Sequence, residues 1–186
     1  PARGPHCSAR GAAIAPLFRG GSQEGGRRAG TLNVPGIAGL GVAAELAKKN
    51  LAEAADRVGS DLVRGLRDRL EAGIRSGVQG LRLNGHPVLR LPSHLNMSFD
   101  LIEGEALMMR LDLAGIAVST GSACSSGSRE PSYVLTAMGC DAVRAAGAVR
   151  FSVGSTTTEA EIDRVIGVLP GIVADLRKAP PAFLKG

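Results

Sequence analysis

The spacing of hydrophobic residues predicts two long helices in the first half of the chain. The first covers residues 34–49, where Pro35 suits the first turn of a helix. The second runs from about residue 51 to residue 74, and its apolar residues recur every three or four positions. These residues are Val63, Leu66, Leu70 and Ile74. They share one face, so we expect an amphipathic helix that lies on a sheet.

Strand patterns follow in the second half of the chain. Two candidates, around residues 79–83 and 94–100, are separated by Asn84, Gly85 and two prolines, which are typical turn residues. A further short apolar strand is expected at residues 115–119. The apolar runs are short and bounded by turn residues, which favours strands over helices.

Two shorter helices are predicted beside these strands. Glu103 and Glu105 suit the positive end of one helix dipole. The buried face of that helix is formed by Leu107, Met108 and Leu111. Pro131 can occupy the first position of a second helix, which stops at Gly139.

The last strand and the last helix carry clear local signals. Residues 148–154 alternate between apolar and polar side chains, which places Arg150 on the polar side of a half-buried strand. Thr158 and Glu161 form a capping box at the start of the last helix, and Pro170 lies inside it, where we expect a kink. The order of elements predicts an α/β fold, or an α+β fold, with helices packed on one mixed sheet.

Composition and charge narrow the classes of function. The net charge is +5, but the arginines are spread along the helices, which argues against a nucleic-acid-binding surface. Aromatic residues make up only 3%, too few for a base-stacking platform. No apolar run reaches the roughly 18 residues of a membrane span, and the sequence does not open on an apolar signal segment. We therefore expect a cytoplasmic protein with no membrane partner and no direct nucleic-acid partner.

The cysteines and histidines do not indicate a disulfide framework or a metal site. Cys7, Cys124 and Cys140 are an odd number at unrelated spacings. The three histidines are equally scattered, whereas a structural zinc ion is usually bound by four ligands. We expect three free thiols and no bound metal.

Cys124 lies in the segment VSTGSACSSGS, residues 118–128, which contains only small side chains around the cysteine. A free thiol with a pKa of about 8.5 is mostly protonated at neutral pH, so a nucleophilic cysteine needs exposure and nearby positive charge. We expect the small residues to let this segment swing, as a thiol that transfers a group requires and a packing thiol does not. A small filler residue in a polar loop is the alternative, and the composition leaves both open.

Two further features have both a functional and a structural interpretation. The guanidinium of Arg150 suits bidentate capture of a substrate carboxylate, but a strand arginine can also simply face solvent. Residues 19–31 contain five glycines together with Arg27, Arg28 and Thr31, which can cradle a phosphate. The segment lacks the lysine and the spacing of a nucleotide-binding P-loop, and a flexible linker is the alternative.

Three stretches together resemble the C-terminal half of a cysteine desulfurase with a long, mobile cysteine loop. Such enzymes are fold-type I enzymes that use pyridoxal 5′-phosphate (PLP). The stretches are GGSQEGGRRAGTLNVPGIAGL, LNMSFDLIEGEALMMRLDLAGIAVSTGSACSSGSREPSYVLTAMG and VRFSVGSTTTEAEID. The resemblance covers residues 17–177 in order. It implies a transferase that converts L-cysteine to L-alanine and forms a persulfide on Cys124, for iron–sulfur cluster assembly or tRNA thiolation.

The same resemblance implies a role for each candidate residue. Cys124 matches the nucleophile that attacks the substrate sulfur, and Arg150 matches the arginine that holds the substrate carboxylate. Thr31 matches a threonine that reaches the cofactor phosphate of the neighbouring subunit, so a homodimer with shared sites is implied. The implied partners are L-cysteine, a second copy of the chain, and a sulfur-acceptor or iron–sulfur scaffold protein.

The sequence departs from the family pattern at the Schiff-base lysine, which the family places before the glycine-rich loop. The lysines of this chain match no such segment; they are Lys48, Lys49, Lys178 and Lys185. The histidine often found just before the arginine strand is also absent, with Ala146 near that place. We expect residues 1–50 to be the end of the large, PLP-binding domain with its phosphate loop, and residues 51–186 to be the small domain with the cysteine loop.

The missing Schiff-base lysine bears on the activity of this chain by itself. We expect that this chain alone does not desulfurate cysteine, although the protein from which it derives does. The alternative from another class is a non-enzymatic persulfide carrier or interaction module. In that case Cys124 accepts sulfur from a partner without any cofactor.

Overall fold

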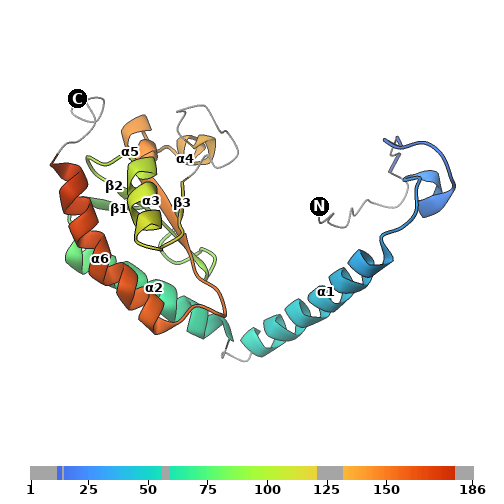
Figure 1. The fold of residues 1–186 in the computed structure, drawn as a ribbon, viewed down its shortest axis with the longest axis horizontal. Helices are drawn as coiled ribbons and strands as arrows, with labels where there is room; N and C mark the ends of the chain where they lie inside the picture. Colours follow the sequence, from blue (N-terminus) through green and yellow to red (C-terminus); the bar gives the residue numbers. More distant parts are fainter. Residues whose placement is uncertain (1–11, 14, 56–58, 121–131, 179–186) are drawn as a thin grey trace. The chain divides into compact units, whose positions relative to one another are not determined.

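The computed structural model describes residues 12–13, 15–55, 59–120 and 132–178. Contacts divide the chain into two units, Pro1–Ala52 and Glu53–Gly186. The first unit contains the short 3-10 helix η1 (Gln23–Gly26) and most of α1 (Val34–Ala55). Both lie in the blue part of the ribbon in Figure 1.

The helix α1 confirms the prediction for residues 34–49 and continues beyond it to Ala55. We expected a second helix to begin near residue 51, but residues 51–55 belong to α1, and the second helix begins at Gly59. These residues read LAEAA, and leucine, alanine and glutamate are strong helix formers that suit either helix. None of the described side chains between residues 12 and 50 is buried. The large apolar side chains that α1 exposes are Val34, Ile37, Leu40, Val42 and Leu46.

The second unit is a four-stranded sheet with helices packed on it, which confirms the predicted fold class. Its helices are α2 (Gly59–Gly77), α3 (Gly104–Leu113), α4 (Tyr133–Ala137), α5 (Ala142–Ala146) and α6 (Glu159–Arg177). Its strands are β1 (Leu81–Leu83), β2 (His94–Phe99), β3 (Ser119–Thr120) and β4 (Ala148–Ser152). They lie in the order β1-β2-β4-β3.

The described strand pairs are all antiparallel, whereas we expected a mixture of parallel and antiparallel pairs. The strands β1 and β2 form a hairpin, which is antiparallel by construction. The strands β2 and β3 are joined through a helix and run in the same direction, as is usual for such a crossover. However, β4 lies between them and pairs antiparallel with both.

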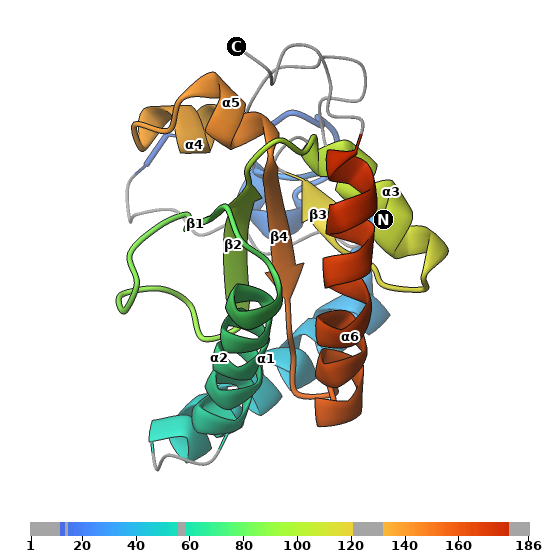
Figure 2. The same cartoon turned by 90° about the vertical axis from the view of Figure 1, so that its left-hand side faces the viewer.

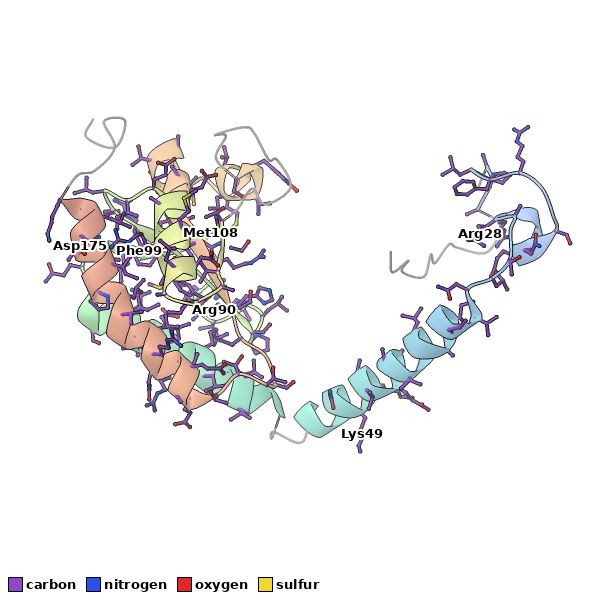
Figure 3. The ribbon with its side chains drawn as sticks, in the orientation of Figure 1. Arg28, Lys49, Arg90, Phe99, Met108 and Asp175 are labelled. Atoms are coloured by element: carbon purple, nitrogen blue, oxygen red, sulfur yellow. The ribbon has the colours of Figure 1, made fainter. Side chains whose placement is uncertain are left out.

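One face of this sheet is covered by α2, α3 and α6 (Figure 2). The residues of the two central strands on this face are buried, with Met97 and Val149 at 0% exposure and Phe99 at 2%; Figure 3 labels Phe99. The predicted apolar face of the second helix is confirmed, because Leu70 and its neighbours are buried in the same cluster. These contacts form the main hydrophobic core of the unit.

The helices α2 and α6 lie side by side along this core (Figure 1). They approach closely at Gly73, where an added Cβ would lie 2.4 Å from the Ile166 side chain. The predicted capping box of α6 is confirmed, since Thr158 and Glu161 each accept a hydrogen bond from the other's backbone N–H. The helix continues through Pro170 to Arg177.

The opposite face of the sheet carries a second, small core at one end, beneath α4 and α5 (Figure 2). Its members are Leu135, Cys140, Ala145 and Ala148. Gly147 joins α5 to β4, and an added Cβ there would lie 2.6 Å from the carbonyl oxygen of Phe99. Only a glycine allows this close approach, which brings α5 onto the sheet.

Several predicted boundaries differ from the structure. The strand expected at residues 115–119 is reduced to Ser119–Thr120, because Gly115 has φ +75° in the turn after α3, and ladder pairing with β4 begins only at Ser119. The helix expected at 131–139 spans Tyr133–Ala137. The sequence prediction missed α5, although Asp141 caps it by accepting a hydrogen bond from the Arg144 backbone N–H.

Candidate functional site

Arg150 lies in the middle of β4 on the face of the sheet opposite the main core. Its Cα partner on β2 is Asn96, and its Cα partner on β3 is Ser119. Residues directly opposite each other in neighbouring strands project to the same face, so these three side chains form one polar row across the sheet. The row is accessible, because Arg150 is exposed and both neighbours are half-buried.

The guanidinium of Arg150 makes no hydrogen bond or ion pair with any residue that the structure describes. Its neighbours in the row, Asn96 and Ser119, are uncharged, so no acidic side chain of the row neutralises it. The sequence prediction that Arg150 lies on the polar side of a strand is confirmed. None of the described residues therefore occupies the five N–H donors of the guanidinium, which are suited to an anion.

A buried polar cluster lies beside this row, beneath α4 and α5. Asn84, which follows β1, is 7% exposed and donates through Nδ2 to Asn96 Oδ1 at 2.7 Å and to Ser98 Oγ at 2.8 Å. Arg144 of α5 donates through Nε to Asn84 Oδ1 at 2.9 Å, and through Nη2 to the carbonyl oxygen of Leu83 at 2.8 Å. We call Asn84, Asn96, Ser98 and Arg144 the amide network.

The thiol of Cys140 borders this network, at 3.9 Å from Asn84 Oδ1. Cys140 is a free, buried thiol at 8% exposure, as expected for a thiol outside a disulfide. Its burial in the small core makes it a packing residue. It does not meet the need of a nucleophile for access to substrate.

Cys124, the predicted nucleophile, lies outside the described residues, as does Cys7. The strand β3 ends at Thr120, four positions before Cys124 in the sequence, and it pairs with β4 at Arg150 and Val149. Thr120, the last described residue before Cys124, therefore pairs with the residue next to Arg150 in β4.

The glycine-rich loop belongs to the first unit, so the structure does not place it relative to Arg150. Its backbone has positive φ at Gly20, Gly25, Gly26 and Gly30 and also at Glu24. Arg28 ties the loop together by donating through Nη1 to the carbonyl oxygens of Gly30 and Thr31, at 3.1 and 3.2 Å (Figure 3).

A phosphate fits the residues that this loop leaves accessible. Arg27 and Thr31 are both exposed, and the Thr31 hydroxyl has no hydrogen-bond partner among the described residues. A guanidinium, a hydroxyl and glycine backbone N–H groups are the donors that bind phosphate in proteins. The loop is therefore chemically suited to the phosphate group of a cofactor.

Among the described acidic groups, those with shifted pKa values lie on α2 and α6, on the core side of the sheet. Burial raises the pKa of Glu71, but hydrogen bonds from Arg90 and Arg75 outweigh it and bring the pKa below its usual range. A bidentate hydrogen bond from Arg69, at 2.8 Å to both oxygens, lowers the pKa of Asp163. The Arg69–Asp163 pair joins α2 to α6, and the Arg90–Glu71 pair joins α2 to the segment between β1 and β2. Both pairs are separate from the polar row.

The described ranges contain neither a metal-binding cluster nor a membrane-spanning helix. No group of three or more His, Cys, Asp or Glu side chains there is arranged to hold a metal ion. No helix in the described part of the chain is long and apolar enough to cross a membrane.

Sequence reasoning missed the amide network. Asn84 was interpreted only as a turn residue, and Asn96 was interpreted only as part of a strand. A buried asparagine next to a strand needs hydrogen-bond partners, which is a signal for such a network. The partners themselves depend on strand register, which brings Asn84 beside Asn96 through the backbone hydrogen bond from Asn84 N–H to the carbonyl oxygen of Asn96, at 2.9 Å.

Comparison with known proteins identifies relatives for almost the whole chain. The family model for aminotransferase class-V matches residues 19–165. A cysteine desulfurase of Gluconacetobacter diazotrophicus is 52% identical over 172 residues, which cover 92% of this chain and 42% of that protein. The cysteine desulfurase NifS of Azotobacter vinelandii is 51% identical over 172 residues, with the same coverage of each chain.

A solved structure of a NifS-like protein has a similar fold to this chain. A NifS-like protein superposes on this chain with a TM-score of 0.74 and 35% sequence identity, covering 89% of this chain and 40% of the other. The chain therefore spans less than half the length of the proteins that it matches.

Proposed function

Because the chain belongs to the aminotransferase class-V family and is 52% identical to a cysteine desulfurase, we propose that the protein acts as a PLP-dependent cysteine desulfurase. The proposed reaction converts L-cysteine to L-alanine and leaves the sulfur on Cys124. The chain spans 42% of the length of that relative, so the activity is proposed for the whole protein to which these residues contribute.

The observation that carries this proposal is the position of Arg150. Its exposed guanidinium lies in a polar row without a described acidic partner. A guanidinium binds a carboxylate through two parallel hydrogen bonds, which fix both the position and the orientation of the ligand. We assign Arg150 to the carboxylate of L-cysteine.

Cys124 is proposed as the acceptor of the substrate sulfur. Its thiolate attacks the sulfur of L-cysteine, a sulfur–sulfur bond forms, and the carbon–sulfur bond of the substrate breaks. The substrate carbon takes up a proton and leaves as L-alanine, so L-cysteine and the Cys124 thiol become L-alanine and the Cys124 persulfide. The location of Arg150 on the strand beside β3, which leads to Cys124, supports this pairing of roles.

PLP, which the family uses, supplies an electron sink for the bond changes at the substrate carbon. On this chain, Thr31 and Arg27 are proposed to hold its phosphate, in keeping with their exposure and donor chemistry. Thr31 is proposed to do so for the neighbouring subunit of a homodimer. The persulfide is proposed to pass to a sulfur-acceptor or iron–sulfur scaffold protein, in a cytoplasmic setting.

The proposal can be tested with a chimeric enzyme. The 172 matched residues of the Gluconacetobacter diazotrophicus desulfurase are replaced by those of this chain. We expect the PLP-loaded chimera to produce L-alanine from L-cysteine and to gain about 32 Da on the peptide with Cys124, the mass of one sulfur atom. Cys124→Ser abolishes both signals, and the matched variant Cys140→Ser, at a buried packing thiol, retains them. A folded, PLP-loaded chimera without turnover contradicts the proposal.

A parallel experiment separates the desulfurase from a persulfide carrier. This chain is incubated with PLP and L-cysteine, with and without a second, complete cysteine desulfurase as sulfur donor. A carrier gains one sulfur on Cys124 only with the donor present. If the chimera is inactive and this donor-dependent gain is observed, the carrier function replaces the proposed one.

A further inference from the structure

We propose that Asn96 is a second carboxylate-binding residue beside Arg150, and that the amide network fixes its side chain with the NH2 group toward the ligand. This inference deepens the proposed function and rests on it. It assigns Asn96 to substrate binding, and it assigns Asn84 and Arg144 to positioning the Asn96 side chain. None of these three residues was a candidate from the sequence.

The direction of the hydrogen bonds in the network is set by Arg144. A guanidinium has only donors, so Asn84 must turn its oxygen toward Arg144 Nε, which lies 2.9 Å away. The Cys140 thiol also donates to this oxygen. The amide orientation of Asn84 is therefore determined by chemistry, although oxygen and nitrogen have nearly the same shape.

The orientation of Asn84 determines that of Asn96. With its oxygen occupied, Asn84 presents its NH2 group to the sheet, where Nδ2 donates to Asn96 Oδ1 at 2.7 Å and to Ser98 Oγ at 2.8 Å. Asn96 must accept with its oxygen, which leaves its own NH2 group available. No residue that the structure describes accepts a hydrogen bond from Asn96 Nδ2.

The free NH2 group belongs to a side chain directly opposite Arg150 in the β2–β4 ladder. Opposed residues in antiparallel strands have Cβ atoms about 4.5–5.5 Å apart, so one small anion can touch both side chains. Asn96 is half-buried and Arg150 is exposed, so the pair is open to a ligand on this face. A charged donor next to a neutral donor, with no acceptor presented, favours a carboxylate.

The asparagine adds directional selectivity that the guanidinium alone lacks. A carboxylate oxygen that is not used by Arg150 can accept from Asn96 Nδ2, which fixes the rotation of the ligand around the arginine. An amide held the other way round would present its oxygen and repel the same carboxylate. Arg144 thus determines, through Asn84, which group Asn96 presents to the ligand.

The inference is tested by NMR titration of the chain with sodium acetate, at constant ionic strength against sodium chloride. In the wild type, we expect the Asn96 side-chain NH2 signals and the Arg150 Nε–H signal to shift together with one dissociation constant. This readout needs no substitution. Asn96 signals that do not move while the Arg150 signal does would overturn the inference.

Substitutions test whether Asn84 controls the orientation of the Asn96 side chain. Asn96→Ala is expected to weaken acetate binding about tenfold or more, the effect of losing one hydrogen bond to a charged partner. Asn84→Asp still accepts from Arg144 but can no longer donate to Asn96, so we expect Asn96 to turn round and acetate binding to weaken as much, although Asn96 itself is intact. A purely structural role for Asn84 would not reverse Asn96. Wild-type affinity in either variant overturns the inference.

Two controls separate this inference from the proposed function. Arg82→Gln removes an exposed positive charge from β1 on the same face, and should leave acetate affinity within about twofold because Arg82 is not in the polar row. Arg150→Gln is expected to abolish acetate binding. If it does not, the substrate site of the proposed function fails. If it does while Asn96→Ala and Asn84→Asp bind like the wild type, only the role of Asn96 fails.

Discussion

The two faces of the four-stranded sheet carry opposite kinds of residue. On one face, Met97, Val149 and Phe99 are buried beneath α2, α3 and α6. On the other face, the same strands present Asn96 and Arg150, of which the arginine is exposed. Because successive strand residues point to opposite faces, one stretch of chain builds both.

This difference shows that residues important for stability and residues available for binding can be direct neighbours in the same strand. Burial of apolar side chains on the core face stabilises the unit, whereas the polar face keeps donors accessible at some cost in buried area. The amide network lies between these extremes, since it is polar but only Asn84 and Ser98 are buried, whereas Asn96 and Arg144 are half-buried. Substitutions on the two faces should therefore affect different measurements.

The largest effect on stability is expected on the core face. Leu70→Ala removes a side chain that is 2% exposed and leaves a cavity, so the free energy of unfolding should fall by about 2–5 kcal/mol. Urea unfolding measures this change. Leu62→Ala, on the same helix at 56% exposure, is the matched control and should change stability by less than about 0.5 kcal/mol. Equal losses would contradict the burial pattern.

An intermediate effect is expected in the amide network. Asn84→Ala leaves Asn96 Oδ1 and Arg144 Nε without their hydrogen-bond partner, which should lower the free energy of unfolding by about 1–3 kcal/mol. The same urea experiment measures it. A loss below about 0.5 kcal/mol would mean that water replaces the asparagine and that the network does not hold the second face together.

A smaller, pH-dependent effect is expected from Glu71 on the core side. Its folded-state pKa lies below its unfolded value, so its ion pairs contribute stability above the unfolded pKa of about 4.3, and this contribution is lost as the pH falls through the folded pKa. Glu71→Gln should flatten this acid loss in a series of thermal melts. Glu105→Gln, an exposed residue of α3, should not. An unchanged acid profile in Glu71→Gln would contradict the assignment.

The smallest effect on stability is expected at the centre of the polar face. Arg150→Gln removes an exposed side chain without a described partner, so the free energy of unfolding should change by less than about 0.5 kcal/mol. Urea unfolding checks this, with Arg82→Gln as the control. A loss of more than 1 kcal/mol, on the order of a buried hydrogen bond, would show that Arg150 is structural and would erase the difference between the faces.

Much of the core face was predictable from sequence because local periodicity determines it. The four-residue spacing of Leu66, Leu70 and Ile74 and the two-residue alternation around Phe151 each indicate a buried face, even when the element that packs on it is unknown. The capping box of α6 is likewise a local motif. The boundary between α1 and α2 was not predicted, since residues 51–55 suit either helix. The short β3 was not predicted, since strand pairing depends on neighbours far along the chain.

The polar face was predictable only in part. Arg150 was identified because strand alternation places it opposite the core, but its neighbours depend on register. No spacing in the sequence indicates that Asn84 lies beside Asn96, or that Arg144 reaches both the Asn84 oxygen and the Leu83 carbonyl oxygen. The roles of Cys124 and Thr31 stay predictions, because the first lies outside the described residues and the second is assigned to a neighbouring subunit.

The central claim is that the exposed guanidinium on the polar face binds the carboxylate of L-cysteine for sulfur transfer. Steady-state kinetics of the PLP-loaded chimera tests it most directly, with Arg150→Gln compared against Arg82→Gln. Charge-assisted hydrogen bonds contribute about 1.5–3 kcal/mol, so kcat/KM for L-cysteine should fall roughly 10- to 100-fold in Arg150→Gln, mainly through KM, with PLP loading unchanged. Kinetics of Arg150→Gln that match those of the Arg82→Gln control would contradict the claim.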